Sequence, residues 1–535
     1  MELLDQHAKK IMEECKVRAR DAGLSFDNES LEYIVTNRDL LELTPKGMIP
    51  TLYDFWVNDV GVLKEKGKYQ LYPHNPYETV INSRPAISFY NDNNPDWLNI
   101  MIFYHVLGHI DFFQNNQLFR HTWNDDFVGQ ALADKRYLAN LRSTHGRWVD
   151  YVIEFCRSID NIIGYFPTLF ELNNRDQFQD VKREEYYFGD FHQNYLKTSD
   201  IKYFEEVEKY NRLIESSGEV GDALFFSEIK KKYPEFESRF KIYKEKLTKR
   251  ATDIVEYIRD NSQFLNKDEN NWMKAVINII RNTALYFAPQ IRSKILNEGW
   301  ASYWHDKLFR SDERIAGHEV DYAKVNAMVT SISRVGLNPY AIGLRLIQHV
   351  EDIVGKGQLS YSFQKLMNRE KRKEFDNHTG KGMEAIFFLR NNFSDHMLIQ
   401  TFVDQDFMNE HQLFVTGRRL NQQDGNIEYY VKSRKAEEYQ KMLLNQLYHP
   451  PYITIDEENT SQDNLCLVHH FEGKQLVQDM IFETLVGIEF LWGNQVQLET
   501  TQIVKIQDRN PQNVKFELRK VLFTVKDRKL TKKNL

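Results

Sequence analysis

Apolar residues recur at helical spacing near the N-terminal end of the chain. A helix ended by Gly23 is predicted over residues 2–23, and one of its faces collects Leu3, Leu4, Ala8, Ile11, Met12 and Cys15. Residues 31–37 are typical of a short strand. Residues 78–90 are also β-like, but Pro85 interrupts them, so we expect a strand end or a sheet edge there.

A strongly apolar helix is predicted over residues 94–116. Asn94 suits the N-cap position, and Pro95 suits the first helical position. Because apolar residues cover nearly the whole circumference, we expect this helix to be central and buried. Two histidines lie within it.

Helical patterns continue along the chain and give way to strands toward its C-terminal end. Further helices are predicted within residues 126–172, 201–215, 235–265 and 270–309, the last divided near Pro289. Short strands then alternate with helices at 435–448 and 475–492, in the order β, β, α, β, β, α, β. This order predicts an α+β protein, with a large, mainly helical N-terminal domain followed by a smaller α+β sheet domain.

The same patterns suggest domain boundaries. We predict a mainly helical domain over residues 1–364, a charged connector over 365–384 and an α+β domain over 385–525. The basic tail, residues 526–535, is expected to be frayed.

The amino-acid composition favours a soluble globular protein of the cytoplasm. The 535 residues are 41% apolar and 27% charged, which is ordinary for a soluble globular protein. A net charge of −7 gives no general attraction to nucleic acid. Three widely spaced cysteines argue against a disulfide framework and favour the cytoplasm. The N-terminal residues lack the apolar core of a signal peptide, and no stretch approaches the roughly 18 apolar residues of a membrane span.

The two histidines of the apolar helix, His105 and His109, are four residues apart. This spacing puts both imidazoles on one helix face, with their Cβ atoms about 5–6 Å apart, so that both can reach one metal ion. Spacing alone leaves a second interpretation open, namely two core histidines that are hydrogen-bonded to backbone carbonyls.

A second stretch, NEGWASYWH at residues 297–305, strengthens the metal interpretation. Glu298 and His305 are seven residues apart and share a helix face, while the small Gly299 and Ala301 allow another helix to approach closely. Glu298 would then supply the third ligand of a site with nitrogen and oxygen donors and an open coordination position. Alternatively, Glu298 only caps or hydrogen-bonds a neighbouring element.

NEGWASYWH resembles the Asn-Glu-Gly-Phe-Ala-Ser-Tyr segment of gluzincin aminopeptidases. The resemblance implies a divalent metal, zinc above all, bound by His105, His109 and Glu298. His305 would be a fourth ligand or an acid/base group. Gluzincins use the glutamate of His-Glu-x-x-His as the general base, but Val106 stands here and cannot accept a proton.

Another group would have to replace the missing base. The sequence offers two carboxylates for this catalytic role, Glu78 and Asp111. Asp111 lies two residues beyond His109 and therefore points to a different helix face, where it could also orient a ligand. The stretch GLNPYAIG could line a pocket through Asn338 and Tyr340, or it could simply start a helix.

Several longer motifs make the chain resemble the stage V sporulation protein R (SpoVR) family. They are YETVINSRPAISF, HVLGHIDFFQNN, APQIRSKILNEGWASYWH, GLNPYAIGLRLIQHVEDI and FETLVGIEFLWGNQVQLET, in the order found in that family. The resemblance implies a cytoplasmic bacterial protein linked to spore cortex formation. It also implies a serine protein kinase and a von Willebrand-type protein as partners.

Two departures from the SpoVR pattern remove histidines. Asp54 or Phe55 stands near one family histidine, and Asn326 stands at another. The first hypothesis is therefore a metal-dependent hydrolase with altered chemistry. The second is a non-enzymatic regulatory or scaffold protein that acts with the kinase, and a third, nucleic-acid binding, depends only on the basic C-terminus.

Overall fold

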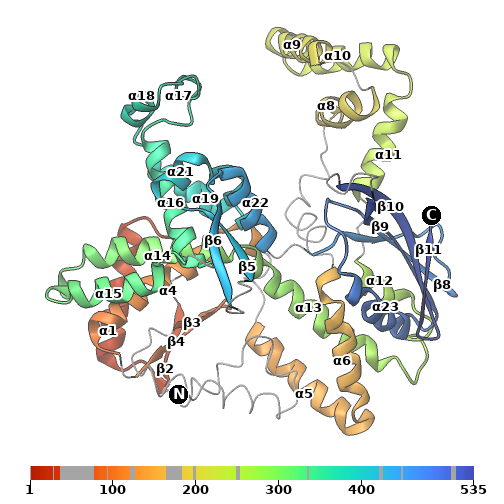
Figure 1. Cartoon of the computed structure of the whole chain (residues 1–535), viewed down its shortest axis with the longest axis horizontal. Coiled ribbons are helices and arrows are strands. Elements are labelled where there is room, and N and C mark those ends of the chain that lie inside the picture. The colour runs from red at the N-terminus through yellow and green to blue at the C-terminus, as the bar shows by residue number, and fades with distance from the viewer. Residues whose placement is uncertain are drawn as a thin grey trace. The chain divides into compact units, whose positions relative to one another are not determined.

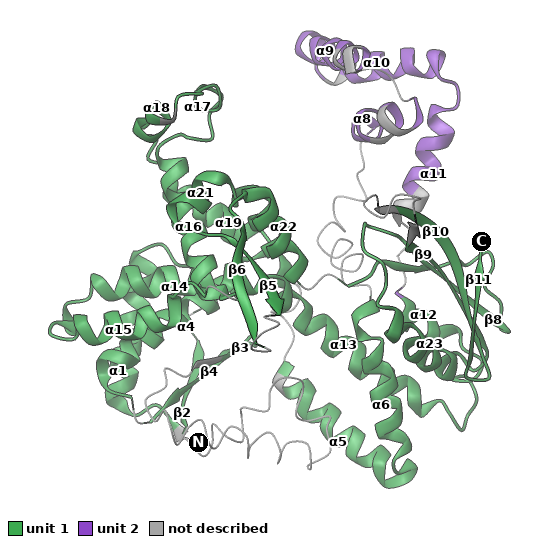
Figure 2. Cartoon of the chain, viewed as in Figure 1, with its two compact units in different colours: residues 1–163, 254–535 green, residues 164–253 purple. Residues whose placement is uncertain are grey.

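The computed structural model divides the chain into two compact units, residues 1–163 with 254–535 and residues 164–253 (Figure 2). The structure describes residues 2–27, 29–35, 78–92, 94–120, 127–163, 183–196, 200–248, 253–333, 336–420, 426–447, 450–507 and 514–535. Helices predominate, and the sheets are small (Figure 1). The predicted class, a mainly helical N-terminal part followed by a smaller α+β part, is confirmed.

The N-terminal region pairs a helix with a four-stranded sheet. Asp5 caps helix α1 (Gln6–Asp21) by accepting a hydrogen bond from the Ala8 amide. The strands β1 (Glu2–Leu3), β2 (Ser30–Val35), β3 (Glu78–Ile81) and β4 (Ala86–Asn91) lie in the order β1-β2-β4-β3. Pro85 lies between β3 and β4, as its pattern predicted, whereas Leu3 belongs to a strand and not to the helix.

Three helices pack closely in the first unit: α4 (Asp96–Asn115), α14 (Lys294–Arg310) and α16 (Pro339–Gly355). Glycine makes this approach possible. A Cβ atom on Gly299 would lie 2.3 Å from the Gly343 carbonyl carbon, and one on Gly108 would lie 2.8 Å from the Ala301 Cα. The close approach predicted at Gly299 and Ala301 is confirmed, and it holds α14 between α4 and α16.

Shorter elements complete this region. They are η1 (Gln117–Phe119), η4 (Glu313–Ile315), α15 (Glu319–Thr330), α17 (Tyr361–Gln364), α18 (Arg369–Glu374), α19 (Gly382–Asn392), α20 (Asp395–Phe402), α21 (Gln405–Glu410), α22 (Ala436–Gln446) and the hairpin β5 (Val415–Leu420) with β6 (Ile427–Ser433). Asn338 caps α16 by accepting hydrogen bonds from the Tyr340 and Ala341 amides, so GLNPYAIG does start a helix.

A second apolar core in the same unit lies against a five-stranded sheet of order β11-β10-β9-β8-β7. The strands are β7 (Ile453–Ile455), β8 (Asn464–His469), β9 (Gln495–Gln507), β10 (Val514–Lys526) and β11 (Lys529–Asn534). The helices that share this core are α5 (Phe127–His145), α6 (Trp148–Ser158), η2 (Asp160–Ile162), α12 (Ile254–Asn261), α13 (Trp272–Arg292) and α23 (Gln478–Trp492).

The basic tail is not frayed, because Lys529–Asn534 pairs along β10 as the edge strand β11. The predicted boundaries at residues 1–364, 365–384, 385–525 and 526–535 remain predictions. The helix break expected near Pro289 falls at Ser293, between α13 and α14.

The second unit has a small aromatic core. Its elements are α8 (Arg183–Tyr186), η3 (Tyr187–Tyr195), α9 (Asp200–Ser217), α10 (Glu219–Lys232) and α11 (Phe236–Thr248). Tyr187, Phe191 and Phe225 are among its fully buried side chains. None of the helices within the described ranges, in either unit, has the length and apolar character needed to cross a membrane.

Candidate metal centre

Helix α4 carries the paired histidines in a buried setting. Fifteen of its residues are buried, including His105 and His109, so the prediction of a central helix is confirmed. The N-cap position belongs to Pro95, one residue after the predicted Asn94. The two imidazoles meet edge to face, with ring centroids 4.7 Å apart.

Helix α14 brings Glu298 against both rings. The Glu298 Oε2 atom lies 3.8 Å from His105 Nε2 and 3.5 Å from His109 Nε2. One ligand atom from each of the three residues lies within 4.8 Å of the other two, so this group could hold a metal ion. The two remote segments that the sequence suggested therefore do meet.

The N-terminus of α14 is fixed by a carboxylate from another helix. Asp395 of α20 is buried and accepts hydrogen bonds of 2.8 Å from the Ile295 and Leu296 amides. Burial raises the pKa of Asp395 to about 7, although the two amide hydrogen bonds oppose the rise. Because these amides belong to the first turn, the contact orients the helix just ahead of Glu298.

A chain of hydrogen bonds determines which nitrogen of His105 carries the proton. Asn326 of α15 turns its Oδ1 atom to His305 Nε2 at 3.0 Å, and an amide oxygen can only accept. A neutral His305 therefore carries its proton on Nε2 and accepts at Nδ1. Its partner, His105 Nδ1 at 2.8 Å, must then donate, which leaves a lone pair on His105 Nε2, toward Glu298.

His109 is oriented in the same way. Its Nδ1 atom donates to Asn297 Oδ1 at 2.9 Å, which leaves a lone pair on Nε2, again toward Glu298. Two imidazole lone pairs and a carboxylate thus face one another. This arrangement could bind a cation between the three groups, and hydrogen bonds of this kind orient the ligands in known metal sites.

Glu298 itself is adapted to carry a negative charge. Burial favours its neutral form, but interactions with the neighbouring His105 and His109 rings and a hydrogen bond from Tyr340 together lower its pKa. Tyr340 also stacks against His105, with ring centroids 6.0 Å apart. The carboxylate is therefore ionised at neutral pH, as a metal ligand must be.

The other residues that the sequence singled out do not belong to this group as the structure describes it. Within the described residues the metal-competent group excludes His305, which contacts the far nitrogen of His105. Glu78 begins β3, but its side chain lies outside the described part of the structure, and so do Asp54 and Phe55. Val106 is completely buried.

Asp111 points away from the paired rings, as its spacing predicted. Its Oδ1 atom accepts hydrogen bonds from the Ser25 amide at 2.7 Å and from Arg390, and its Oδ2 atom accepts one from Trp300 Nε1 at 2.8 Å. Burial raises the pKa of Asp111 to about 6, against the opposing charge of Arg390. These contacts join α4 to α14 and α19.

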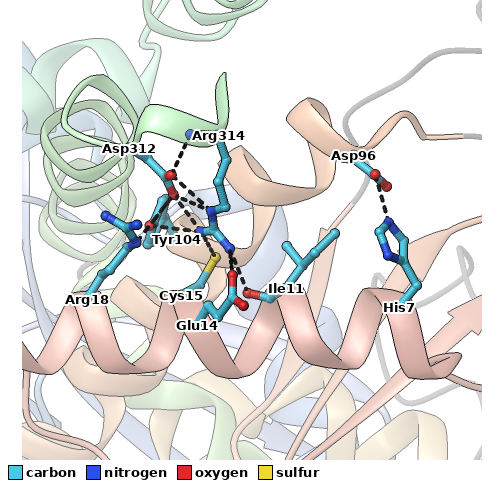
Figure 3. A network of polar contacts seen from close by, with 9 residues as sticks. All are labelled: His7, Ile11, Glu14, Cys15, Arg18, Asp96, Tyr104, Asp312 and Arg314. Atoms are coloured by element: carbon cyan, nitrogen blue, oxygen red, sulfur yellow. Dashed lines mark hydrogen bonds and ion pairs between the residues drawn. The ribbon is translucent and has the colours of Figure 1, made fainter. Parts of the chain in front are cut away.

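A second polar network, drawn in Figure 3, holds α4 at Tyr104, two turns before Asp111 on the same face of the helix. The Tyr104 hydroxyl donates to Asp312 Oδ2 at 2.7 Å, and the Arg314 guanidinium binds the same carboxylate. Arg314 also reaches Glu14 and Cys15 on α1 (Figure 3). Burial opposes the ionised form of Asp312, yet the hydrogen bonds from Arg314 and Tyr104 outweigh it and lower its pKa to about 2.

Sequence reasoning missed three contributors to the site. Asn297 adjoins Glu298 in the NEG motif, and that position was the available signal. Tyr340 was singled out as a pocket candidate but not as a neighbour of His105. Nothing local to residue 395 indicated that it would cap a helix a hundred residues earlier.

These observations define a helical protein with a buried histidine–carboxylate centre, and comparisons place it in a family. Residues 2–450 match the family described as "SpoVR like protein", so the chain belongs to that family. It is similar to the "Uncharacterized protein YcgB" of Escherichia coli (strain K12), with 22% identity over 406 residues, which cover 71% of this chain and 69% of that protein. No solved structure matches the chain.

Proposed function

We propose that His105, His109 and Glu298 bind one divalent metal ion, with zinc favoured, and that the centre serves metal-assisted hydrolysis. The observation that carries the proposal is the convergence of the three ligand atoms within 4.8 Å. Two imidazoles and one carboxylate suit zinc, and three protein ligands leave a coordination position open, as in catalytic zinc sites.

The chain's own residues would prepare this centre. Asn297 and His305 hold the two imidazole rings so that each presents its Nε2 atom. When bound, the metal would supply Lewis-acid polarisation of a carbonyl group and activation of water. We also propose that the two histidines and the glutamate bind the ion in the way that the corresponding ligands of gluzincins do.

The proposed hydrolysis also needs a general base. Val106 cannot accept a proton, which leaves the two carboxylates that the sequence offered. Both oxygens of Asp111 already accept hydrogen bonds, from Ser25, Arg390 and Trp300. We therefore favour Glu78 as the base and Asp111 as a residue that positions α4. His305, which already hydrogen-bonds His105, would act as a positioning residue and not as a fourth ligand.

Family membership supports the wider biological part of the proposal. We propose a cytoplasmic protein that contributes to spore cortex formation in organisms that form spores. The alternative is a regulatory or scaffold protein in which the centre is structural and the partners are a serine protein kinase and a von Willebrand-type protein. The apolar Val106 at the position of the usual base favours this alternative.

Metal analysis of the purified full chain tests the centre directly. We expect about one zinc per wild-type chain after exposure to zinc and removal of the excess, and loss of this zinc in His109→Ala. The matched control is His470→Ala, because His470 is exposed and contacts Thr454 instead of the centre. A wild-type protein without stoichiometric metal, or a His109→Ala protein that keeps it, would overturn the proposal.

The two candidate functions separate in a second measurement. If the centre is catalytic, Glu298→Gln loses metal and hydrolytic activity together while partner binding is retained. If the protein is a scaffold with a structural metal, removing the metal weakens capture of the kinase.

A further inference from the structure

A cavity of about 360 Å³ lies in the sheet-bearing part of the first unit, and no residue of the metal centre lines it. Its walls come from η2, from the strands β7 to β9 and from α23. Most of the wall is aliphatic, with buried side chains such as Ile162, Leu467, Ile481, Leu485 and Leu498. Protein interiors rarely contain voids larger than a water molecule, whereas small-molecule sites measure roughly 300–1,000 Å³.

Two polar groups with buried atoms, Asn161 and His469, lie among the aliphatic walls. Asn161 Oδ1 is buried and accepts no hydrogen bond from the described residues. Leaving an amide oxygen in this state costs stability that a hydrogen-bond donor on a ligand would restore. His469, also in the wall, is held by Thr500 at 2.8 Å.

The interior of the cavity carries no fixed charge among its described residues. Burial lowers the pKa of His469, so its ring is neutral at neutral pH. The charged lining residues, Glu472 and Lys474, are both exposed and of opposite sign. An ion would therefore lose hydration inside the cavity without gaining a charged partner.

We propose that this cavity binds an uncharged small molecule with an apolar body and one hydroxyl or amide N–H group, which donates to Asn161 Oδ1. The aliphatic walls account for the apolar body, and the buried acceptor accounts for the donor. The proposal is independent of the metal centre.

Three naphthalene derivatives test the chemical class, because they share one apolar body. 2-Naphthol has a hydroxyl donor, 2-methoxynaphthalene has none, and 2-naphthoate is an anion at pH 7. Equilibrium dialysis against the full chain should give saturable 1:1 binding of 2-naphthol, about tenfold weaker binding of 2-methoxynaphthalene and little binding of 2-naphthoate.

Two variants tie the binding to this cavity. Thr484→Phe, whose new ring would enter the cavity, should abolish binding of all three compounds. The matched control Glu483→Phe changes an exposed neighbour outside the lining and should bind like the wild type. Asn161→Leu should bind 2-naphthol about tenfold more weakly and leave 2-methoxynaphthalene unchanged, which also reports that the fold is intact.

Several outcomes would overturn the inference. Unsaturable binding of 2-naphthol, or binding that survives Thr484→Phe, would mean that the compound does not occupy this cavity. Preference for 2-naphthoate would refute an uncharged ligand. Equal loss of both neutral compounds in Asn161→Leu would refute the role assigned to the amide oxygen.

Discussion

The core around α4 contains a linked set of buried polar groups, which the apolar cluster against the five-stranded sheet lacks. Around α4, His105, Asp111 and Arg390 are buried, and each has defined hydrogen-bond or ion-pair partners. Against the sheet, the cluster is apolar and includes Ile277 and Leu485. An apolar core stabilises a fold without aiming particular atoms, whereas buried polar groups hold atoms at set distances and are costly when a partner is lost.

The largest expected effect is on the polar core. Asp111→Ala leaves the Arg390 guanidinium buried without its carboxylate, which should lower the free energy of unfolding by about 3–5 kcal/mol. Denaturant unfolding of the full chain measures this change. In Asp111→Ala/Arg390→Met, where both charges are gone, much of the loss should be recovered. A single variant as stable as the wild type would show that the pair contributes little.

The apolar core should respond through packing alone. Leu485 is almost fully buried, so Leu485→Ala should lower the free energy of unfolding by about 2–5 kcal/mol through lost contacts and a cavity. The same variant should bind zinc like the wild type. A change in zinc affinity would show that packing in the sheet-side core affects the geometry of the centre on α4.

A smaller effect is expected from the residues that orient the ligands. Asn297→Ala removes the acceptor for His109 Nδ1, so the ring loses its fixed tautomer, and zinc affinity should fall by about 10–100-fold. Competition with a chelator of known affinity measures this. The comparison variant Asn278→Ala alters an amide that contacts Arg259 on α12, and it should leave zinc affinity unchanged.

The smallest effect is a pH dependence in the network beside α1. Asp312 has a pKa of about 2 in the folded protein, below its usual value of about 3.9. Its ionised form therefore stabilises the fold fully above about pH 4, and this contribution is lost as the pH falls toward 2. Asp312→Asn should be less stable than the wild type at pH 6.

Unfolding of both proteins measured between about pH 2 and pH 6 shows whether ionised Asp312 stabilises the fold. The stability difference between the wild type and Asp312→Asn should shrink between about pH 4 and pH 2, because the wild-type carboxyl becomes neutral there. A difference that stays constant with pH would show that the charge of Asp312 is not what stabilises the network.

Local sequence patterns predicted the site's helices better than its supporting contacts. The buried helix around His105 was predictable because its apolar residues surround it, and the small Gly299 indicated a close helix neighbour. The N-terminus of α14 depends on Asp395, a contact across 100 residues that no local pattern encodes. The roles of Asn297 and Tyr340 also depend on which side chains the fold brings together.

The C-terminal region shows the same limit. Its order of strands and helices was predicted as far as β9, and α22 and α23 lie close to their expected positions. Residues 526–535 were expected to be frayed because they are basic and polar. They form β11 because β10 offers backbone partners, and backbone hydrogen bonds do not depend on side-chain polarity.

The distance along the chain between the two ligand-bearing helices has a consequence for biosynthesis. His105 on α4 and Glu298 on α14 meet in the fold, and all of residues 164–253 lie between them along the chain. The ribosome must therefore release α14 before His105, His109 and Glu298 can come together. Binding of the proposed metal would then be a late step in the folding of the chain. Chains truncated before residue 294 lack α14 and could not bind the ion.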